Sequence, residues 1–195
     1  MRDSSNGFPR GPGSVGPVSR QNCVLFYNLI MLKAVFPGSF DPPTLGHLNI
    51  IERASSVFDE LAIVVAENRQ KKHLFSAEER LFMMQEMVKS WKNVRCTIWD
   101  ALIVDYMKRE NIRLIVRGVR GMDDFSYEFE LSMMNKALYP DIETIFMTTE
   151  SRYIVLRSSS IKEIASFHGD VSLMVPPLVA EALKKKYSEP AYQRE

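Results

Sequence analysis

Residues 32–58, LKAVFPGSFDPPTLGHLNIIERASSVF, carry the pattern that decides the fold. The run Leu32–Phe36 is almost continuously apolar, which predicts a strand covered on both faces. A loop dense in turn residues follows, and Thr44 then precedes apolar residues at helical spacing, namely Leu48, Ile51, Ala54, Val57 and Phe58. This stretch therefore predicts a strand, a tight loop and an amphipathic helix, in that order.

The same alternation continues along the chain. Further short apolar runs occur at Leu61–Ala66, Val94–Trp99, Ile112–Val116 and Glu143–Met147, with helical patterns between them. Alternating strands and helices form right-handed crossovers and a parallel sheet. We therefore expect one α/β domain with a Rossmann-like, parallel five-stranded sheet and helices on both faces. Ligands bind such a sheet at the carboxyl ends of its strands.

Polar residues indicate where the later helices begin. Two four-residue segments, starting at Ser76 and Ser160, have the capping-box pattern. Other aspartates and a proline stand where the remaining helical patterns start. The expected first or capping residues are Ser76, Asp100, Asp123 or Asp124, Ser160 and Pro176.

Length and composition exclude several classes of protein. The 195 residues are 46% hydrophobic and 25% charged, the balance of a globular domain. The 25 Lys and Arg residues against 24 Asp and Glu give a formal net charge of +1, so we expect no nucleic-acid partner but leave room for a local cationic pocket. The apolar run from Val24 to Phe36 is too short to span a bilayer, so no membrane association is expected.

Two cysteines, Cys23 and Cys96, and three histidines offer neither a disulfide framework nor zinc-ligand spacing. We therefore expect a reducing cytoplasmic location and no protein ligand to a metal. The first 20 residues are rich in Gly, Pro and Ser, so residues 1–30 are expected to be a disordered extension. The predicted domain covers residues 31–187, and a tail follows at residues 188–195.

The loop after the first strand points to phosphate chemistry. It ends on a helix start, where free N–H groups and the macrodipole favour an anion. Gly46 permits close approach of a ligand to the backbone, and His47 projects toward the same anion. A lone histidine at a helix start is more often a surface polar residue than a catalyst. However, Thr44-Leu45-Gly46-His47 is a form of the (T/H)-x-G-H signature, and with Gly38–Pro42 it resembles the nucleotidyltransferase superfamily of α/β phosphodiesterases.

Segments further along the chain resemble one particular family within this superfamily. Three segments follow or flank strand ends, namely Lys71–Phe75, Arg117–Arg120 and Asp124–Glu130. Together they resemble the bacterial phosphopantetheine adenylyltransferases, and the resemblance covers essentially residues 31–187. Singly, a lysine pair and an Arg-Gly-x-Arg turn are ordinary surface features. The resemblance implies attack by the phosphate of 4′-phosphopantetheine on the α-phosphorus of ATP, which yields dephospho-coenzyme A and pyrophosphate.

The resemblance also implies roles for individual residues. His47, Lys71 and Arg120 are implied as catalytic, and with Arg117 and the helix N-terminus they would supply a positive field. The acceptor substrate is expected at Ser39, Lys71, Ile103 and Arg117, although Ile103 fits an ordinary core position nearly as well. The residues implied at the ATP site are Ser39, Phe40, His47, Gly118, Val119, Arg120, Glu128, Tyr153, Ile154, Val155, Leu156, Arg157, Ser158 and Ser159.

One position departs from the family pattern. The family commonly has Ile-Ser-Ser-Ser where this chain has Leu156-Arg157-Ser158-Ser159. Ser158 and Ser159 keep hydroxyl donors near a helix start, where they would serve ATP or simply cap the helix. Arg157 instead adds a positive charge where the family usually has a hydroxyl.

The resemblance further implies Mg²⁺, held through phosphate oxygens and water, and a homohexamer, the assembly of its relatives. Two alternatives stay open. One is another adenylyl- or cytidylyltransferase of the superfamily, acting on nicotinate mononucleotide or glycerol phosphate, against which Lys71-Lys72 and Arg117–Arg120 argue. The other is a non-catalytic nucleotide-binding module, expected to lose His47 or Lys71, both of which are present.

Overall fold

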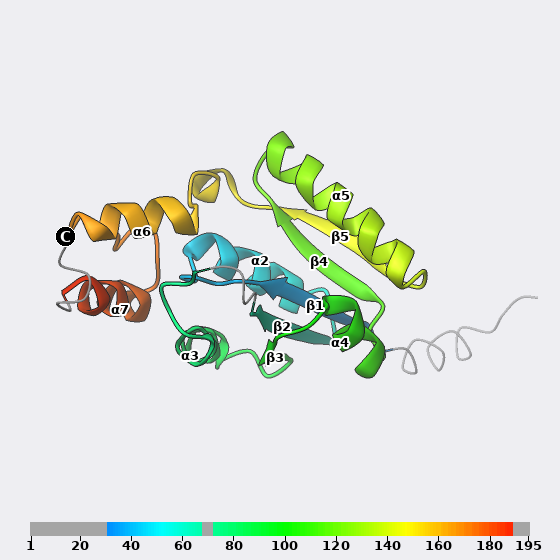
Figure 1. The fold of residues 1–195 in the computed structure, drawn as a ribbon. Helices are drawn as coiled ribbons and strands as arrows, with labels where there is room; N and C mark the ends of the chain where they lie inside the picture. The colour runs from blue at the N-terminus through cyan, green and yellow to red at the C-terminus, as the bar shows by residue number, and fades with distance from the viewer. Residues whose placement is uncertain (1–30, 68–71, 189–195) are drawn as a thin grey trace, which may run out of the picture. The chain divides into compact units, whose positions relative to one another are not determined.

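The sheet of the computed structural model has the predicted architecture. The structure describes residues 31–67 and 72–188, so residues 1–30, Lys71 and the segment after Ser188 lie outside it. Five parallel strands pair in the order β3-β2-β1-β4-β5 (Figure 1). The strands are β1 (Lys33–Gly38), β2 (Glu60–Ala66), β3 (Val94–Trp99), β4 (Leu114–Val119) and β5 (Glu143–Thr148). The predicted fold class is confirmed, and each predicted strand lies within a few residues of an observed one.

Helices cover both faces of this sheet. Two of them, α2 (Leu45–Ser55) and α3 (Ala77–Val88), pack on one face, where Ile50, Ile51 and Met84 meet Phe36 and Ile63. The opposite face carries α4 (Ile103–Arg109) and α5 (Met122–Leu138). A short turn of 3₁₀ helix, η1 (Ser151–Tyr153), follows β5, and α6 (Ser158–Ser166) and α7 (Pro177–Ser188) complete the described chain.

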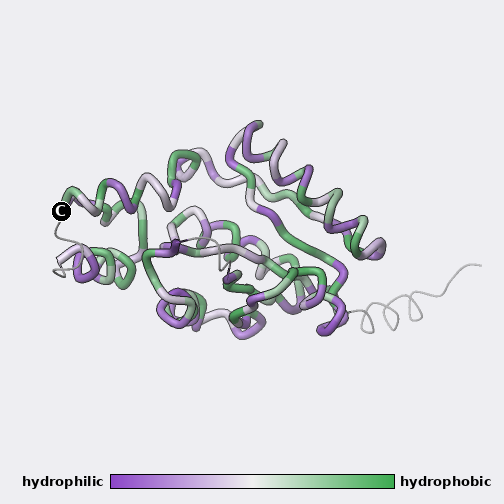
Figure 2. The backbone as a smooth tube through the Cα atoms, in the orientation of Figure 1, coloured by the Kyte–Doolittle hydropathy of each residue, from purple (hydrophilic) through white to green (hydrophobic). Residues whose placement is uncertain are grey.

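Burial differs between the middle and the edges of the sheet. The central strands β1 and β2 are almost completely buried, and Figure 2 shows runs of hydrophobic residues along the strands. The edge strands β3 and β5 are only half-buried, and both contain more polar residues than β2. The expectation that every strand is covered on both faces is therefore wrong at the edges, where a strand has a neighbour on one side only.

Two of the predicted helix starts are confirmed. Thr44 caps α2 and Ser76 caps α3, each through a capping box. Asp100 does not cap α4, since Leu102 occupies that position. Gly121 is the N-cap of α5, because the carboxylate of Asp124 is bound instead by Arg120.

The starts of the last two helices also differ from the prediction. α6 begins at Ser158 and not behind Ser160, because the Ser158 hydroxyl is bonded to the carbonyl of Pro42 at 2.8 Å and anchors an earlier first turn. α7 begins at Pro177, one residue after the expected Pro176. These differences leave the order of elements unchanged.

The topology determines where a ligand fits. β1 pairs with β2 on one side and with β4 on the other, so the connections leave β1 and β4 on opposite faces of the sheet. This is the switch point of a doubly wound sheet, where a crevice opens beyond the carboxyl ends of the strands. The predicted loop Gly38–Pro42 lies there. Among the described residues, no helix is long and apolar enough to cross a membrane.

Candidate active site

Two adjoining cavities lie at the switch point. The first, of about 490 Å³, is bordered by the ends of β1 and β4 and by the starts of α2, α5 and α6. The second, of about 370 Å³, shares part of its wall with the first. The residues that line both cavities are Phe40, His47, Ser158 and Ser159.

His47 stands at this shared wall, held by reciprocal hydrogen bonds with Thr44. The Thr44 backbone N–H donates to His47 Nδ1 at 3.0 Å, and the His47 backbone N–H donates to the Thr44 hydroxyl oxygen at 3.3 Å. Because Nδ1 accepts a backbone N–H, the proton of the neutral ring is on Nε2. The ring also packs edge-on against Phe40, with centroids 5.1 Å apart. The capping box therefore fixes both the tautomer and the orientation of the histidine.

His47 is neutral at physiological pH. Loss of hydration in the cavity wall, reinforced by the positive charge of Arg120, lowers the pKa of His47 to about 4. The expectation that His47 adds positive charge to the site is therefore wrong. The residue instead offers a neutral N–H donor at the junction of the two cavities.

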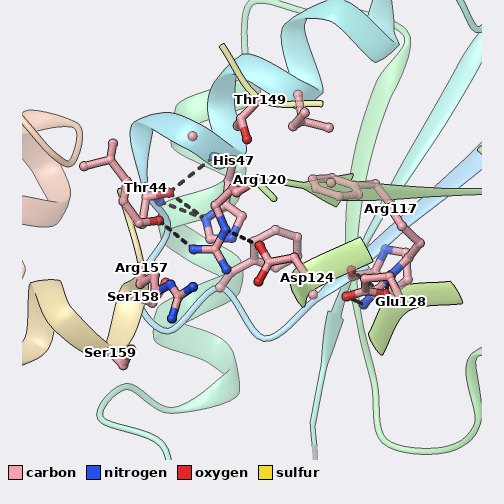
Figure 3. Close-up of a pocket in the computed structure, with 18 residues that line it drawn as sticks. Thr44, His47, Arg117, Arg120, Asp124, Glu128, Thr149, Arg157, Ser158 and Ser159 are labelled. Atoms are coloured by element: carbon pink, nitrogen blue, oxygen red, sulfur yellow. Dashed lines mark hydrogen bonds and ion pairs between the residues drawn. The ribbon is translucent and has the colours of Figure 1, made fainter. Parts of the chain in front are cut away.

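Three arginines line the first cavity, and two of them, Arg117 and Arg120, are each held by a carboxylate of α5. Arg117 Nε and Nη2 donate to the two Glu128 carboxylate oxygens at 2.5 and 2.6 Å, and Arg117 Nη1 donates to the carbonyl of Pro37 at 2.9 Å. Arg120 Nε donates to Asp124 at 2.6 Å. In Figure 3, Arg117 and Glu128 lie at one end of the labelled residues and Arg157 to Ser159 at the other, with His47 and Arg120 between them.

Phe40 shapes the wall between the cavities. Its side chain is buried, and its backbone has a positive φ of 49°, which is uncommon for a residue other than glycine. A Cβ on Gly38 would lie 2.8 Å from the Phe40 ring. Glycine at position 38 therefore allows the ring to fold back over the end of β1.

Asp41 lines the second cavity and connects three segments of the chain. Its carboxylate accepts the backbone N–H groups of Leu74 and Phe75, both at 3.0 Å, and the Lys162 ammonium at 2.8 Å. Burial by itself raises the pKa of Asp41, but Lys162 and the two N–H donors outweigh it, so the net pKa is lowered and the group is ionised. Asp41 thus joins the β1–α2 loop, the segment before α3, and α6.

His73 and Arg80 lie beside this junction. Burial, followed by the nearby Arg80, lowers the pKa of His73, so its ring is neutral at pH 7. His73 Nε2 is buried and has no hydrogen-bond partner within the described part of the chain. The buried Arg80 donates to the carbonyl oxygens of Ser39 and Ala66, at 2.7 and 3.1 Å, and so supports the loop from the opposite side.

The segment between β5 and α6 forms the far wall of the first cavity. Asn49 of α2 donates to Glu150 at 2.6 Å, and Thr149 donates through its backbone N–H to the carbonyl of Val119 at 3.1 Å. These bonds hold the segment against α2 and the end of β4. Of the residues expected at the ATP site in this segment, Leu156, Arg157, Ser158 and Ser159 line the cavity, whereas Tyr153, Ile154 and Val155 do not.

The remaining expected residues are distributed unevenly. Gly118 lines the first cavity and Ser39 the second, whereas Val119 is buried beside them and lines neither. Ile103 begins α4 and packs into the cluster on the opposite face of the sheet, apart from both cavities. Lys71 lies outside the described residues.

Several cavity residues were not among the sequence predictions. Asp124 and Thr149 line the first cavity, and Asp41, His73 and Lys162 line the second. The four-residue spacing of Arg120 and Asp124 could have indicated their ion pair. Lys162 lies four residues after Ser158, on the same face of a helix, which could have indicated its position.

Comparison with known proteins agrees with this geometry. The family model for cytidylyltransferase-like proteins matches residues 35–164. A solved structure from Vibrio parahaemolyticus, provisionally named a nicotinate-nucleotide adenylyltransferase, superposes with a TM-score of 0.62 at 20% identity and covers 82% of this chain and 97% of that one. The sheet, the site and the family match define a nucleotidyltransferase of the cytidylyltransferase-like class.

Curated relatives define the family more narrowly. The chain is 49% identical over 157 residues to the phosphopantetheine adenylyltransferase of Dictyoglomus thermophilum, covering 80% of this chain and 96% of that protein. It is 50% identical over 153 residues to the protein of the same name from Clostridium tetani, covering 78% of this chain and 96% of that protein. The chain belongs to the phosphopantetheine adenylyltransferase family.

The ionisation of His47 can be tested by NMR titration of the ligand-free protein. Because the folded pKa of about 4 lies below the usual value of 6.5, the ring should remain the neutral Nε2–H tautomer from pH 8 down to about pH 5.5. The stability associated with this neutral ring should be fully present above pH 6.5 and lost as the pH falls through 4. Ring ¹⁵N shifts report the tautomer, and a His47→Asn variant assigns them. A titration midpoint near 6.5 would contradict the assignment.

Proposed function

We propose that this protein transfers the adenylyl group of ATP to 4′-phosphopantetheine and so produces dephospho-coenzyme A and pyrophosphate. The observation that carries the proposal is the convergence of His47, Arg117 and Arg120 on one cavity at the sheet's switch point. Membership of the phosphopantetheine adenylyltransferase family supports the choice of acceptor.

The acceptor phosphate is already a nucleophile, so the reaction requires no nucleophile from the protein. Catalysis then consists of bringing two anions together and stabilising the negative charge that develops on the α-phosphate. The neutral His47 N–H donor is proposed to bind an α-phosphate oxygen, and the fixed arginines are proposed to offset the repulsion between the substrates. A neutral donor held in place by Thr44 needs no reorganisation during the reaction.

The arginines keep donors available while their carboxylate partners hold them. Arg117 uses three of its five N–H donors on Glu128 and Pro37, which leaves two for a phosphate. We assign Arg117, with Ser39 and Lys71, to the acceptor phosphate, and Arg120 to the phosphates of ATP. Phe40, Gly118 and the Leu156–Ser159 segment would surround the nucleotide. Arg157 would add a charge at the cavity wall, where the other two arginines are already paired.

Mg²⁺ is the proposed counter-ion of the β- and γ-phosphates. Within the described ranges, no group of three or more His, Cys, Asp or Glu side chains could hold a metal ion, and the carboxylates of the first cavity are bound to arginines. This donor set fits an ion carried by nucleotide oxygens and water. When bound, Mg²⁺ would neutralise charge on the leaving pyrophosphate. The cytoplasmic location remains a prediction from the cysteine usage.

The acceptor can be identified by a pyrophosphate-release assay. The full chain with ATP and Mg²⁺ should release pyrophosphate with phosphopantetheine and at least about a hundredfold more slowly with nicotinate mononucleotide or glycerol phosphate, because a site matched to one acceptor leaves polar groups unpaired with others. Reactions without acceptor provide the background. Preference for another acceptor would favour the alternative transferase, and release with none would favour a non-catalytic module.

The assignment of the two arginines can be tested with charge-conserving variants. Arg117→Lys should raise the Michaelis constant for phosphopantetheine much more than that for ATP, and Arg120→Lys should do the reverse, since each loses a planar, charged hydrogen bond worth about 1.5–3 kcal/mol. Each variant serves as the control for the other, because each removes one guanidinium from the same cavity and keeps its charge. Equal effects on both substrates would overturn the division of roles.

We also propose that the protein assembles as a homohexamer through α5. This helix has no buried residue, and six of its large apolar side chains are about half exposed or more. Six such side chains on 17 residues form an apolar patch that a monomer would leave in water. The exposed apolar residues are Met122, Tyr127, Phe129, Met133, Met134 and Leu138.

Sedimentation of the full chain tests this assembly. The expected particle has six times the chain mass of 22.4 kDa, and the double variant Met133→Lys with Met134→Lys should dissociate it, since two charges in an apolar contact are strongly unfavourable. Leu173→Lys is the matched control, because Leu173 is exposed but lies outside α5. A monomeric wild-type protein would contradict the proposal.

A further inference from the structure

A third cavity, of about 200 Å³, lies between α3 and α7, both of which are labelled in Figure 1. Its lining comes from α3, from the segment just before that helix, and from α7. None of its lining residues belongs to the two cavities of the active site or to α5. The proposed catalytic roles and the proposed assembly therefore leave this third cavity unused.

Most of the residues that line the third cavity are apolar. Phe75 and Met83 are each only 3% exposed, and they share one hydrophobic cluster with Leu178 and Ala182. Phe82 borders the same space and is 55% exposed. Apolar surface in a concave site gains free energy when an apolar ligand covers it and displaces water. The third cavity is therefore suited to the hydrocarbon part of a ligand.

Three charged side chains complete the lining. Lys186 Nζ is paired with the Glu79 carboxylate at 3.3 Å and lies 5.8 Å from the centre of the Phe75 ring. Lys185 is exposed, and within the described ranges its ammonium group has no ion pair or hydrogen bond. Two ammonium groups and one carboxylate give the lining a net charge of +1. The third cavity therefore combines an apolar interior with one unbalanced positive charge.

This charge balance favours a ligand with a single negative charge. A carboxylate carries one charge at pH 7, and Lys185 can balance it while the pair of Lys186 and Glu79 stays intact. A phosphate monoester carries about −1.5 to −2 at the same pH, so Glu79 would repel it more strongly. The lining is thus matched to a monocarboxylate better than to a phosphate.

The volume of the cavity limits the apolar part of the ligand. Sites for drug-sized molecules have volumes of roughly 300–1,000 Å³, so a cavity of about 200 Å³ fits a shorter molecule. Leu178 and Ala182 are one helical turn apart on α7, so one alkyl chain can contact both. We propose that the third cavity binds a medium-chain monocarboxylate of about eight carbons, with its chain between α3 and α7 and its carboxylate on Lys185.

NMR of methionine methyl groups tests this site, with octanoate as the probe and the ligand-free full chain as the sample. The Met83 methyl signal, assigned with a Met83→Leu variant, should shift on titration because Met83 lines the cavity. The signal of Met134, on the exposed apolar face of α5, should stay unchanged. Hexanoate, which is two CH₂ groups shorter, should bind about tenfold more weakly.

Charge reversal on α7 tests the role of Lys185. Lys185→Glu changes the net charge of the lining from +1 to −1 and should weaken octanoate binding about tenfold. Lys184→Glu is the matched control, because Lys184 is the preceding residue of the same helix but does not line this cavity. Its affinity for octanoate should stay within about twofold of the wild-type value. Both lysines are exposed, so both variants should keep the fold, which circular dichroism checks.

A third variant tests the apolar part of the cavity. Ala182→Phe fills the space between the helices and should abolish the shift of the Met83 signal. Absence of that shift in the wild-type protein at millimolar octanoate would refute the site. Parallel shifts of Met83 and Met134, or equal loss of affinity in the two lysine variants, would reveal unspecific association with exposed apolar surface and refute it as well. Tighter binding of octyl phosphate than of octanoate would overturn the assignment to a monocarboxylate.

Discussion

The reciprocal hydrogen bonds between Thr44 and His47 are the constraint on which the site depends. They begin α2, they place the imidazole in the wall between two cavities, and they leave its proton on Nε2. A protonated histidine could not accept the Thr44 N–H, so the cap and a positive ring exclude each other. The lowered pKa of His47 is consistent with this arrangement. One short motif therefore sets the start of a helix, a tautomer and the direction of a donor.

A second feature of the site is that three of its cations are each held by a carboxylate. Arg117 and Arg120 are bound by Glu128 and Asp124 of α5, and Lys162 is bound by Asp41. Several free cations around one empty cavity would repel one another. The carboxylates reduce that repulsion and fix the orientation of the side chains, and an arriving phosphate shares donors that are already in place. Glu128, which family resemblance assigns to ATP, is in this structure the partner of Arg117.

The sequence predicted the order of strands and helices well, because these elements are specified by patterns among neighbouring residues. Alternating apolar runs and helical spacing specify the five strands, and the capping boxes at Thr44 and Ser76 specify two helix starts. The start at Gly121 reflects a local ion pair, from Arg120 to Asp124, whereas the start at Ser158 depends on a bond to a distant segment, from Ser158 to Pro42. Resemblance to the family identified His47, Arg117 and Arg120 as site residues, and all three line the first cavity. The ion pair of Arg117 with Glu128, and that of Lys162 with Asp41, join residues 11 and 121 positions apart, and no sequence spacing indicates them.

The contact between Asp41 and Lys162 also sets an order of assembly. All five strands lie between residues 33 and 148, so a nascent chain that ends after β5 already contains the entire sheet. The walls contributed by residues 149–162 come later, and the buried carboxylate of Asp41 has no ammonium partner until α6 has been made. Loop closure over such a separation is slow compared with local pairing. During synthesis, the binding crevice is therefore among the last parts of the domain to be completed, well after the core that supports it.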